Sequence, residues 1–317
     1  MAHYHSLLLI VIDDNRLFLC GIKFDGQIAS SFEEIATELN PETDKITQVS
    51  CSAFHVLIVV NDVDVYSAGC NTWGNLGRNT TGQTQLPLGR VVINRSPSSS
   101  EDADGDQVMN SDKPESGWRV KKIGCGAINS LILFENGELY TCYSSYLEPK
   151  KSIVFEKVVL PFTEPIQQLH FSPLGTHMML QTKSDLWACG SNKYGQLLTG
   201  HFQTVNGVKK CDMKSFIGDA NYRLFLLRGR TFIATRDHLY AIGDNRYGQL
   251  GTVNTTTNYQ LQRVAIDFSD KELVSMEGGY DYTLFTCRQS TGFIFMNNLS
   301  RQRTNEHFAD VEIKHAD

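Results

Sequence analysis

The chain repeats one short segment, and this repetition constrains its fold more than any other feature. Residues 185–197 read DLWACGSNKYGQL and residues 238–250 read HLYAIGDNRYGQL, which agree at eight of thirteen positions. A third, weaker copy, GCNTWGNLG, lies at 69–77. Self-similarity at a regular period indicates that one supersecondary unit is being reused. The copies therefore repeat either a ligand loop or a structural unit.

Six segments fit one template of two apolar strands, a tight turn, and a Leu or Val followed by an aromatic residue and a glycine. They are 5–28, 46–77, 120–143, 166–198, 224–251 and 273–297. The glycine, or the residue in its place, recurs at steps of 48, 74, 47, 53 and about 54 residues, and the longest step contains an insert. Short strands repeated with such a period predict the blades of a β-propeller.

We therefore expect an all-β chain: a β-propeller of about six four-stranded blades. A degenerate seventh blade around 78–118 is the alternative. The segment 31–39 (SFEEIATEL) is predicted as helix in a surface loop. The first copy begins at its second strand, whereas 308–313 carries a Phe-x-x-Val pattern like that of the other first strands. Because unpaired sheet edges are aggregation hazards, we predict that 308–313 completes the first blade and closes the ring.

Charge is concentrated in one segment. The acidic, serine-rich stretch 94–117 carries a net charge of −4 out of −6 for the chain, and we expect it to be a flexible insert within a single domain spanning 1–317. The near-neutral remainder argues against a nucleic-acid or chromatin surface. Serines at 98–100 next to acids suit an acid-directed kinase; an unmodified loop is the alternative. The longest apolar run, 6–12, is far shorter than the ~20 residues that span a bilayer, so no membrane partner is expected.

The cysteines follow the repeat. Cys20, Cys142 and Cys189 occupy one repeat position, where other copies have Ala68 and Ile242. A position that alternates among Cys, Ala and Ile is occupied by a small buried hydrophobe rather than by a metal ligand or a disulfide partner. Reduced thiols predict a cytoplasmic or nuclear protein.

The motifs GSNKYGQL, GDNRYGQLG and GCNTWGNLG resemble the repeats of the regulator of chromosome condensation family. QVSCSAFHVLIV and GGYDYTLF resemble the other half of that repeat, and the resemblance covers nearly all of the chain except 94–117. It implies a β-propeller, typically of seven blades, and a protein partner, with a Ran-type small GTPase as one class. The residues that we expect to define the repeat are Gly69, Asn71, Gly74, Gly190, Asn192, Gly195, Gly243, Asn245 and Gly248.

One position, at the start of the second strand, is the strongest candidate for function. In family members that exchange nucleotide on such GTPases, histidines at this position and acids just before them lie on the face that meets the GTPase. The candidate partner-facing residues here are His5, His55, His177, Arg230, Asp281 and Tyr282. The structural alternative is that each side chain hydrogen-bonds the turn of the neighbouring blade.

These residues lead to three functional hypotheses. The first is a monomeric, protein-binding propeller acting as a regulatory or adaptor module. The second is a guanine-nucleotide exchange factor for a Ran-like small GTPase, although no segment matches the family's protruding β-wedge. The third is a propeller hydrolase with carboxylates scattered in its channel. No nucleophile-elbow, zinc-protease, phosphate-loop or dinucleotide-binding motif occurs, so we predict neither enzymatic chemistry, nor a metal, nor a cofactor.

Overall fold

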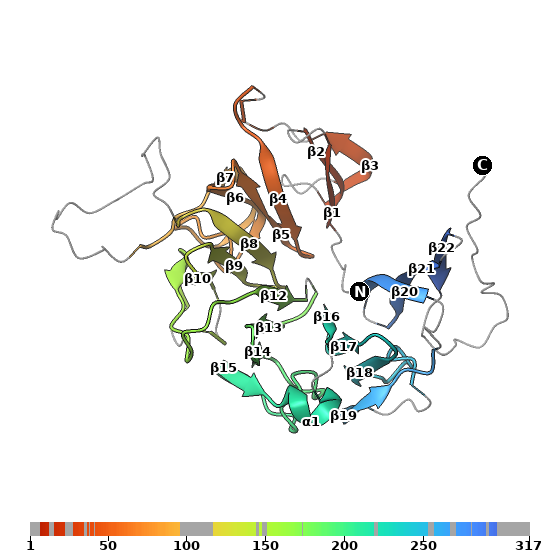
Figure 1. Cartoon of the computed structure of the whole chain (residues 1–317). Helices are drawn as coiled ribbons and strands as arrows, with labels where there is room; N and C mark the ends of the chain where they lie inside the picture. Colours follow the sequence, from red (N-terminus) through yellow and green to blue (C-terminus); the bar gives the residue numbers. More distant parts are fainter. Residues whose placement is uncertain are drawn as a thin grey trace. The chain divides into compact units, whose positions relative to one another are not determined.

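A computed structural model gives the fold of the chain (Figure 1). It describes residues 7–12, 16–22, 28–34, 37, 39–40, 42–95, 117–143, 146–147, 151–172, 174–218, 221–252, 257–266, 271–279, 281–289 and 292–296. His5, most of the predicted insert and the proposed closing strand 308–313 lie outside these residues. The chain divides into two compact units, Met1–Leu169 and His170–Asp317.

The first unit contains three antiparallel sheets whose strands follow one another in chain order. The first sheet has three strands, β1 (Leu7–Ile12), β2 (Arg16–Ile22) and β3 (Ile28–Glu34). The second has β4 (Ile46–Cys51), β5 (His55–Val60), β6 (Asp64–Asn71) and β7 (Gln83–Arg90). The third has β8 (Val120–Cys125), β9 (Ser130–Phe134), β10 (Leu139–Cys142) and β11 (Glu156–Lys157).

The second unit repeats this pattern. One sheet has β12 (Gln168–Phe171), which begins at the boundary, with β13 (His177–Gln181), β14 (Leu186–Gly190) and β15 (Val205–Cys211). The next has β16 (Arg223–Leu227), β17 (Arg230–Ala234), β18 (Leu239–Gly243) and β19 (Asn258–Arg263). The last has β20 (Lys271–Gly278), β21 (Thr283–Gln289) and β22 (Gly292–Met296). A five-residue helix, α1 (Met213–Ile217), follows β15.

The all-β prediction is confirmed, and among the described residues four sheets have four strands. The second strand of each repeat is the most apolar: β5 and β9 are buried at every position. Runs such as HVLIVV and SLILF combine β-branched and large apolar residues, which suit a strand buried on both faces. A tight turn at Asn136-Gly137 joins β9 to β10, and Gly137 there has a φ of 88°.

A bulge explains the apolar spacing of the first strands. The register shifts between Ile46 and Gln48 in β4, between Val120 and Lys122 in β8, and between Leu273 and Ser275 in β20. An extra residue in the strand changes which side chains share a face. Apolar residues three apart, such as Val120 and Ile123, are therefore both buried. The Φ-x-x-Φ pattern read from the sequence is the signature of this bulge.

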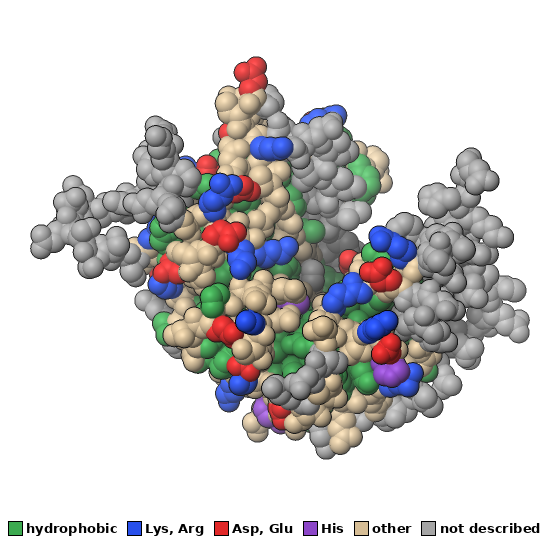
Figure 2. Space-filling model, in the orientation of Figure 1, with side chains coloured by type: hydrophobic (Ala, Val, Ile, Leu, Met, Phe, Trp, Pro, Cys, Tyr) green, Lys and Arg blue, Asp and Glu red, His purple; other side chains and the backbone are tan. Residues whose placement is uncertain are grey.

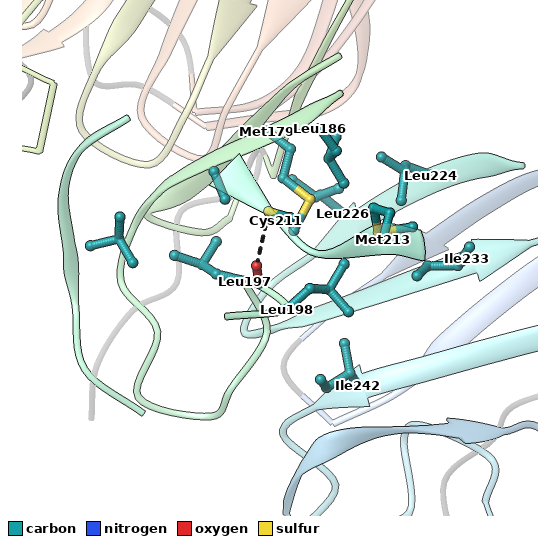
Figure 3. Close-up of a cluster of buried hydrophobic side chains, with 12 residues drawn as sticks. Met179, Leu186, Leu197, Leu198, Cys211, Met213, Leu224, Leu226, Ile233 and Ile242 are labelled. Atoms are coloured by element: carbon teal, nitrogen blue, oxygen red, sulfur yellow. Dashed lines mark hydrogen bonds between the residues drawn. The ribbon is translucent and has the colours of Figure 1, made fainter. Parts of the chain in front are cut away.

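Each unit has its own apolar cores. One core of the second unit gathers aliphatic residues from β13 to β18, the turn at Leu197 and Leu198, and α1 (Figure 3). Cys211 belongs to it and donates through Sγ to the Leu197 carbonyl oxygen at 3.3 Å. All eight cysteines are free thiols, and burial raises the pKa of Cys142 and Cys211 to about 12. Five of them are buried as small apolar side chains, whereas Cys20, Cys51 and Cys70 are partly buried.

Two predictions about local structure need correction or restriction. Residues 31–34 of the predicted helix form the end of strand β3, because pairing with β2 outweighs the helix propensity of SFEEIATEL. Arg16 and Glu34 also pair across these two strands. The described part of 78–118 adds β7 to the second sheet instead of starting another blade. The blade number and the ring closure stay predictions.

Candidate functional site

Three strands of the repeat open on a polar residue that faces a glycine. His55, His177 and Arg230 begin β5, β13 and β17, and they pair across the sheet with Gly69, Gly190 and Gly243 respectively. The three glycines have φ values of 112°, 109° and 123°. A Cβ on any of them would collide with the carbonyl oxygen just before the opening residue. The glycine therefore lets the two backbones approach closely at this end of the blade.

His55 connects two sheets of the first unit. Its Nδ1 lies 3.0 Å from Ser52 Oγ, and its Nε2 lies 2.8 Å from Ser130 Oγ at the start of β9. Ser130 Oγ in turn donates to the Asn75 carbonyl oxygen at 2.7 Å. The side chain of His55 is fully buried, and this desolvation lowers its pKa to about 4. At neutral pH the imidazole is therefore uncharged. Its hydrogen bonds, with that of Ser130, join neighbouring sheets, and we call such a line of contacts between two sheets a seam.

Arg230 performs the same task in the second unit. It is fully buried, and it donates to Thr283 Oγ1 at 3.1 Å, to the Gly279 carbonyl oxygen at 2.9 Å and to the Tyr282 carbonyl oxygen. Thr283 Oγ1 completes the seam by donating to the Gln249 carbonyl oxygen at 2.8 Å. Burial lowers the pKa of Arg230 to about 10, with Asp244 and Asp281 opposing the shift.

His177 lies at the equivalent place one blade earlier. It is buried, and desolvation lowers its pKa to about 4. The seam beside it repeats the Ser130 and Thr283 contacts, because Thr231 Oγ1 donates to the Gln196 carbonyl oxygen at 2.8 Å. The contacts of His55 and Arg230 are those of the structural alternative stated above. A partner-facing role for these buried side chains stays a prediction, and His5 lies outside the described residues.

The repeated asparagines hold the loop that follows each glycine. Oδ1 of Asn71, Asn192 and Asn245 accepts from the backbone N–H five residues later at 3.1, 2.8 and 2.9 Å. Their Nδ2 atoms donate further along the same loop, for example from Asn192 to the His201 carbonyl oxygen at 2.6 Å. Gly74, Gly195 and Gly248 follow with φ values of 85°, 77° and 77°. The motif thus repeats a structural unit, and it places the residue directly before the second glycine at the tip of the loop.

That residue is aromatic, and it is not among the site residues predicted from the sequence. Trp73 and Tyr247 have 37% and 55% of their surface exposed, and Tyr194 is half-buried. Two of the predicted residues, Asp281 and Tyr282, are also exposed, on the turn between β20 and β21. The pattern that indicates these exposed rings is Asn-x-aromatic-Gly, in which the Asn and the Gly shape the loop and the aromatic residue lies between them. A ring at a loop tip is free to contact another molecule.

Arg246 stands beside these rings in the second unit. Its Nε and Nη2 donate to the two carboxylate oxygens of Asp244, each at 2.9 Å, and Nη2 also donates to Tyr194 OH at 2.9 Å. The guanidinium carbon lies 5.2 Å from the ring centre of Tyr194 and 5.9 Å from that of Tyr247. The Asp244 carboxylate raises the pKa of Arg246 well above its usual range. The side chain is a permanently charged group in a fixed orientation.

The rest of the described surface carries mixed charge. Figure 2 shows acidic and basic side chains interspersed on the face drawn. In the described part of the chain, no group of three or more His, Cys, Asp or Glu side chains could hold a metal ion. Nor is any described helix long and apolar enough to cross a membrane.

Known proteins share both the sequence pattern and the fold. No family model matches the chain. The regulator of chromosome condensation of Xenopus laevis is 26% identical over 276 residues, which cover 79% of this chain and 58% of that protein. The chain thus spans somewhat over half the length of this curated relative.

Two solved structures have similar folds. The crystal structure of human WBSCR16 has a TM-score of 0.67 at 18% identity and covers 89% of this chain and 72% of its own. Prp20p from Saccharomyces cerevisiae, studied with its binding to Gsp1p and histones, has a TM-score of 0.63 at 17% identity and covers 84% and 60%. With the repeated Gly and Asn motifs, these similarities identify the chain as a β-propeller like that of the regulator of chromosome condensation.

Proposed function

We propose that this chain is a protein-binding β-propeller that acts as a regulatory or adaptor module in the cytoplasm or nucleus. The observation that supports it is the exposure of Trp73 and Tyr247 at equivalent loop positions of two repeats. Tyr, Trp and Arg are enriched where proteins bind one another, because large amphipathic rings combine apolar contact area with a polar atom. A fold of this kind serves many partners, so the site and not the fold carries the proposal.

Site-specific photo-cross-linking tests this function. p-Benzoylphenylalanine replaces Tyr247 in one variant and Trp73 in another, and a matched control carries it at Arg236, an exposed residue in the turn between β17 and β18. We expect irradiation of cells to give protein adducts from positions 247 and 73 that are absent from position 236. Equal adducts from all three positions, or none from the loop positions, would refute the protein-binding function.

A second candidate is guanine-nucleotide exchange on a Ran-like small GTPase. It is favoured by the exposed Asp281 beside Tyr282, and by the similarity to Prp20p, whose binding to Gsp1p has been studied. An exchange factor needs no catalytic nucleophile, because it binds the nucleotide-free GTPase better than the loaded form. The test is release of fluorescent GDP from loaded small GTPases at micromolar chain. Acceleration that is lost in Asp281→Asn supports exchange, and an unchanged release rate excludes it for the GTPases used.

A further inference from the structure

The guanidinium of Arg246 has donors left over after its contacts within the chain. Asp244 occupies Nε and one hydrogen of Nη2, and Tyr194 OH accepts the other hydrogen of Nη2. Among the described residues, neither hydrogen of Nη1 has an acceptor. The side chain of Arg246 is 56% exposed, so these hydrogens are open to another molecule.

Tyr194 offers a second donor beside them. Its phenolic oxygen accepts from Arg246 at 2.9 Å, which orients the hydroxyl and leaves its own proton to be donated outward. The ring is held in place, since a Cβ on Gly229 of the next blade would lie 2.9 Å from it. Two donors on a rigid support, one of them cationic, match the two oxygens of a carboxylate.

Further charged side chains surround these donors. The loop ends of the second unit carry three cations that are at least partly exposed, on Lys193, Arg228 and Arg246. Asp281 is exposed there, whereas the Asp244 carboxylate is only 7% exposed and already holds Arg246. Lys193 and Arg228 therefore add positive charge at these loop ends outside the Asp244–Arg246 pair, and Glu277 is a further exposed acid there. Complementary charge speeds encounter with a partner and fixes its orientation.

We infer that Arg246 and Tyr194, flanked by the exposed Tyr247, form a binding site for an Asp or Glu side chain on a partner protein. The inference rests on the proposed protein-binding function and names the chemistry of its contact. Tyr247 would pack on the apolar surface around the partner's acid and exclude water, which strengthens the charged hydrogen bonds. Asp244 is a positioning residue, because it fixes the plane of the guanidinium without meeting the partner.

The experiment uses the full chain and a fluorescein-labelled peptide of alternating Glu and Ala. Binding is followed by fluorescence anisotropy, beside a length-matched Gln and Ala peptide and an oligodeoxynucleotide of equal charge. The variants are Arg246→Lys, which keeps the charge and loses the planar fork, and Tyr194→Phe, which removes only the hydroxyl. Arg236→Lys, at the far end of β17, is the matched control.

We expect the Glu peptide to bind, and each of the two site variants to raise its Kd by about tenfold, the loss of one charge-assisted hydrogen bond. Arg236→Lys should leave the Kd unchanged, and the Gln peptide should not bind. Equal affinity of the Arg246→Lys variant and the unmodified chain overturns the inference. Tighter binding of the oligonucleotide than of the Glu peptide overturns it as well, in favour of a nucleic-acid phosphate.

A cross-linking arm separates this inference from the proposed function. Adducts formed by p-benzoylphenylalanine at position 247 are compared with and without Arg246→Lys. Adducts that persist unchanged in the Lys variant leave the protein-binding surface standing and remove the carboxylate contact. If positions 247 and 73 both give none even with Arg246 intact, the proposed function itself fails.

Discussion

At the scale of single residues, Asn75 shows what one methylene does within a repeat. Its carbonyl oxygen accepts from Ser130, as those of Gln196 and Gln249 do from Thr231 and Thr283. The side chain of Gln196 also accepts from the Tyr194 N–H at 3.0 Å and donates to the Ser191 carbonyl oxygen at 2.8 Å. The shorter Asn75 is fully buried, and both of its amide atoms lack a partner among the described residues. A buried amide without partners is destabilising.

Asn75→Gln should therefore stabilise the chain. The longer side chain would reach the Trp73 N–H and the Cys70 carbonyl oxygen, which are equivalent to the partners of Gln196. Each recovered hydrogen bond contributes about 1 kcal/mol to the free energy of unfolding, measured by urea denaturation. The reciprocal variant Gln196→Asn should lose a similar amount. Finding that both substitutions leave the urea midpoint where it was would contradict this account.

Gly243 illustrates a second residue-level constraint. A Cβ there would lie 2.7 Å from the Cα of Arg230, and the φ of 123° is one that side chains avoid. Gly243→Ala should therefore lower the free energy of unfolding by about 3 kcal/mol or more. Gly200→Ala is the matched control, since Gly200 has a φ of 74° and nothing lies within 4 Å of its Cβ position. It should cost only about 1 kcal/mol; equal losses for the two variants would show that close approach does not matter.

At the scale of elements, buried histidines make the seams between blades sensitive to acid. The pKa of His55 and of His177 is lowered to about 4 in the folded chain, whereas an unfolded histidine titrates at 6.5. The unfolded state thus takes up protons first as pH falls. Their contribution to stability is complete above about pH 6.5 and is lost progressively down to about pH 4.

We expect the unmodified chain to lose on the order of 2 kcal/mol per buried histidine between pH 7 and pH 5. The measurement is the urea midpoint at several pH values in a constant salt concentration. His55→Gln keeps a polar side chain without a titration, so it should be less stable at pH 7 but fall less steeply toward pH 5. Parallel pH profiles for the two proteins would exclude His55 as a source of the acid sensitivity.

The elements also show how far the sequence could be read. Strands β5 and β9 were predictable because each carries an apolar run of strand length, LIVV and LILF. The bulge in β8 is reflected in the spacing of Val120 and Ile123. The helix expected at 31–39 was wrong over 31–34, because these residues pair with β2. Pairing with a strand distant in sequence is not contained in local propensity. Arg230 is buried against Thr283, which lies fifty-three residues away in the sequence. Because such a partner is not visible locally, the sequence could not show whether a polar residue at the start of a strand is buried between sheets or exposed to a partner protein.

At the scale of the whole molecule, the sheet of β1, β2 and β3 has one strand fewer than most other sheets among the described residues. Strands β1 and β2 correspond to β5 and β6. The first residue of β1, Leu7, pairs with Gly21 of β2, just as the first residue of β5, His55, pairs with Gly69 of β6. The sheet of β1 therefore has no counterpart of β4 among the described residues. In β4, β8 and β20 that first strand carries two apolar residues three apart around a bulge. Phe308 and Val311 have the same spacing.

We predict that 308–313 supplies this strand, pairs with β1 and closes the ring. Deleting 305–317 should then lower the Tm by several degrees. The deletion removes a paired strand and its buried contacts, and it leaves the edge of β1 unpaired. Phe308→Ser with Val311→Ser should act in the same direction, and Asp310→Ser with Glu312→Ser is the matched control on the same segment. An unchanged Tm after the deletion would mean that the ring closes in another way. A fall in Tm with the control pair, equal to that of the apolar pair, would trace the effect to charge instead of strand packing.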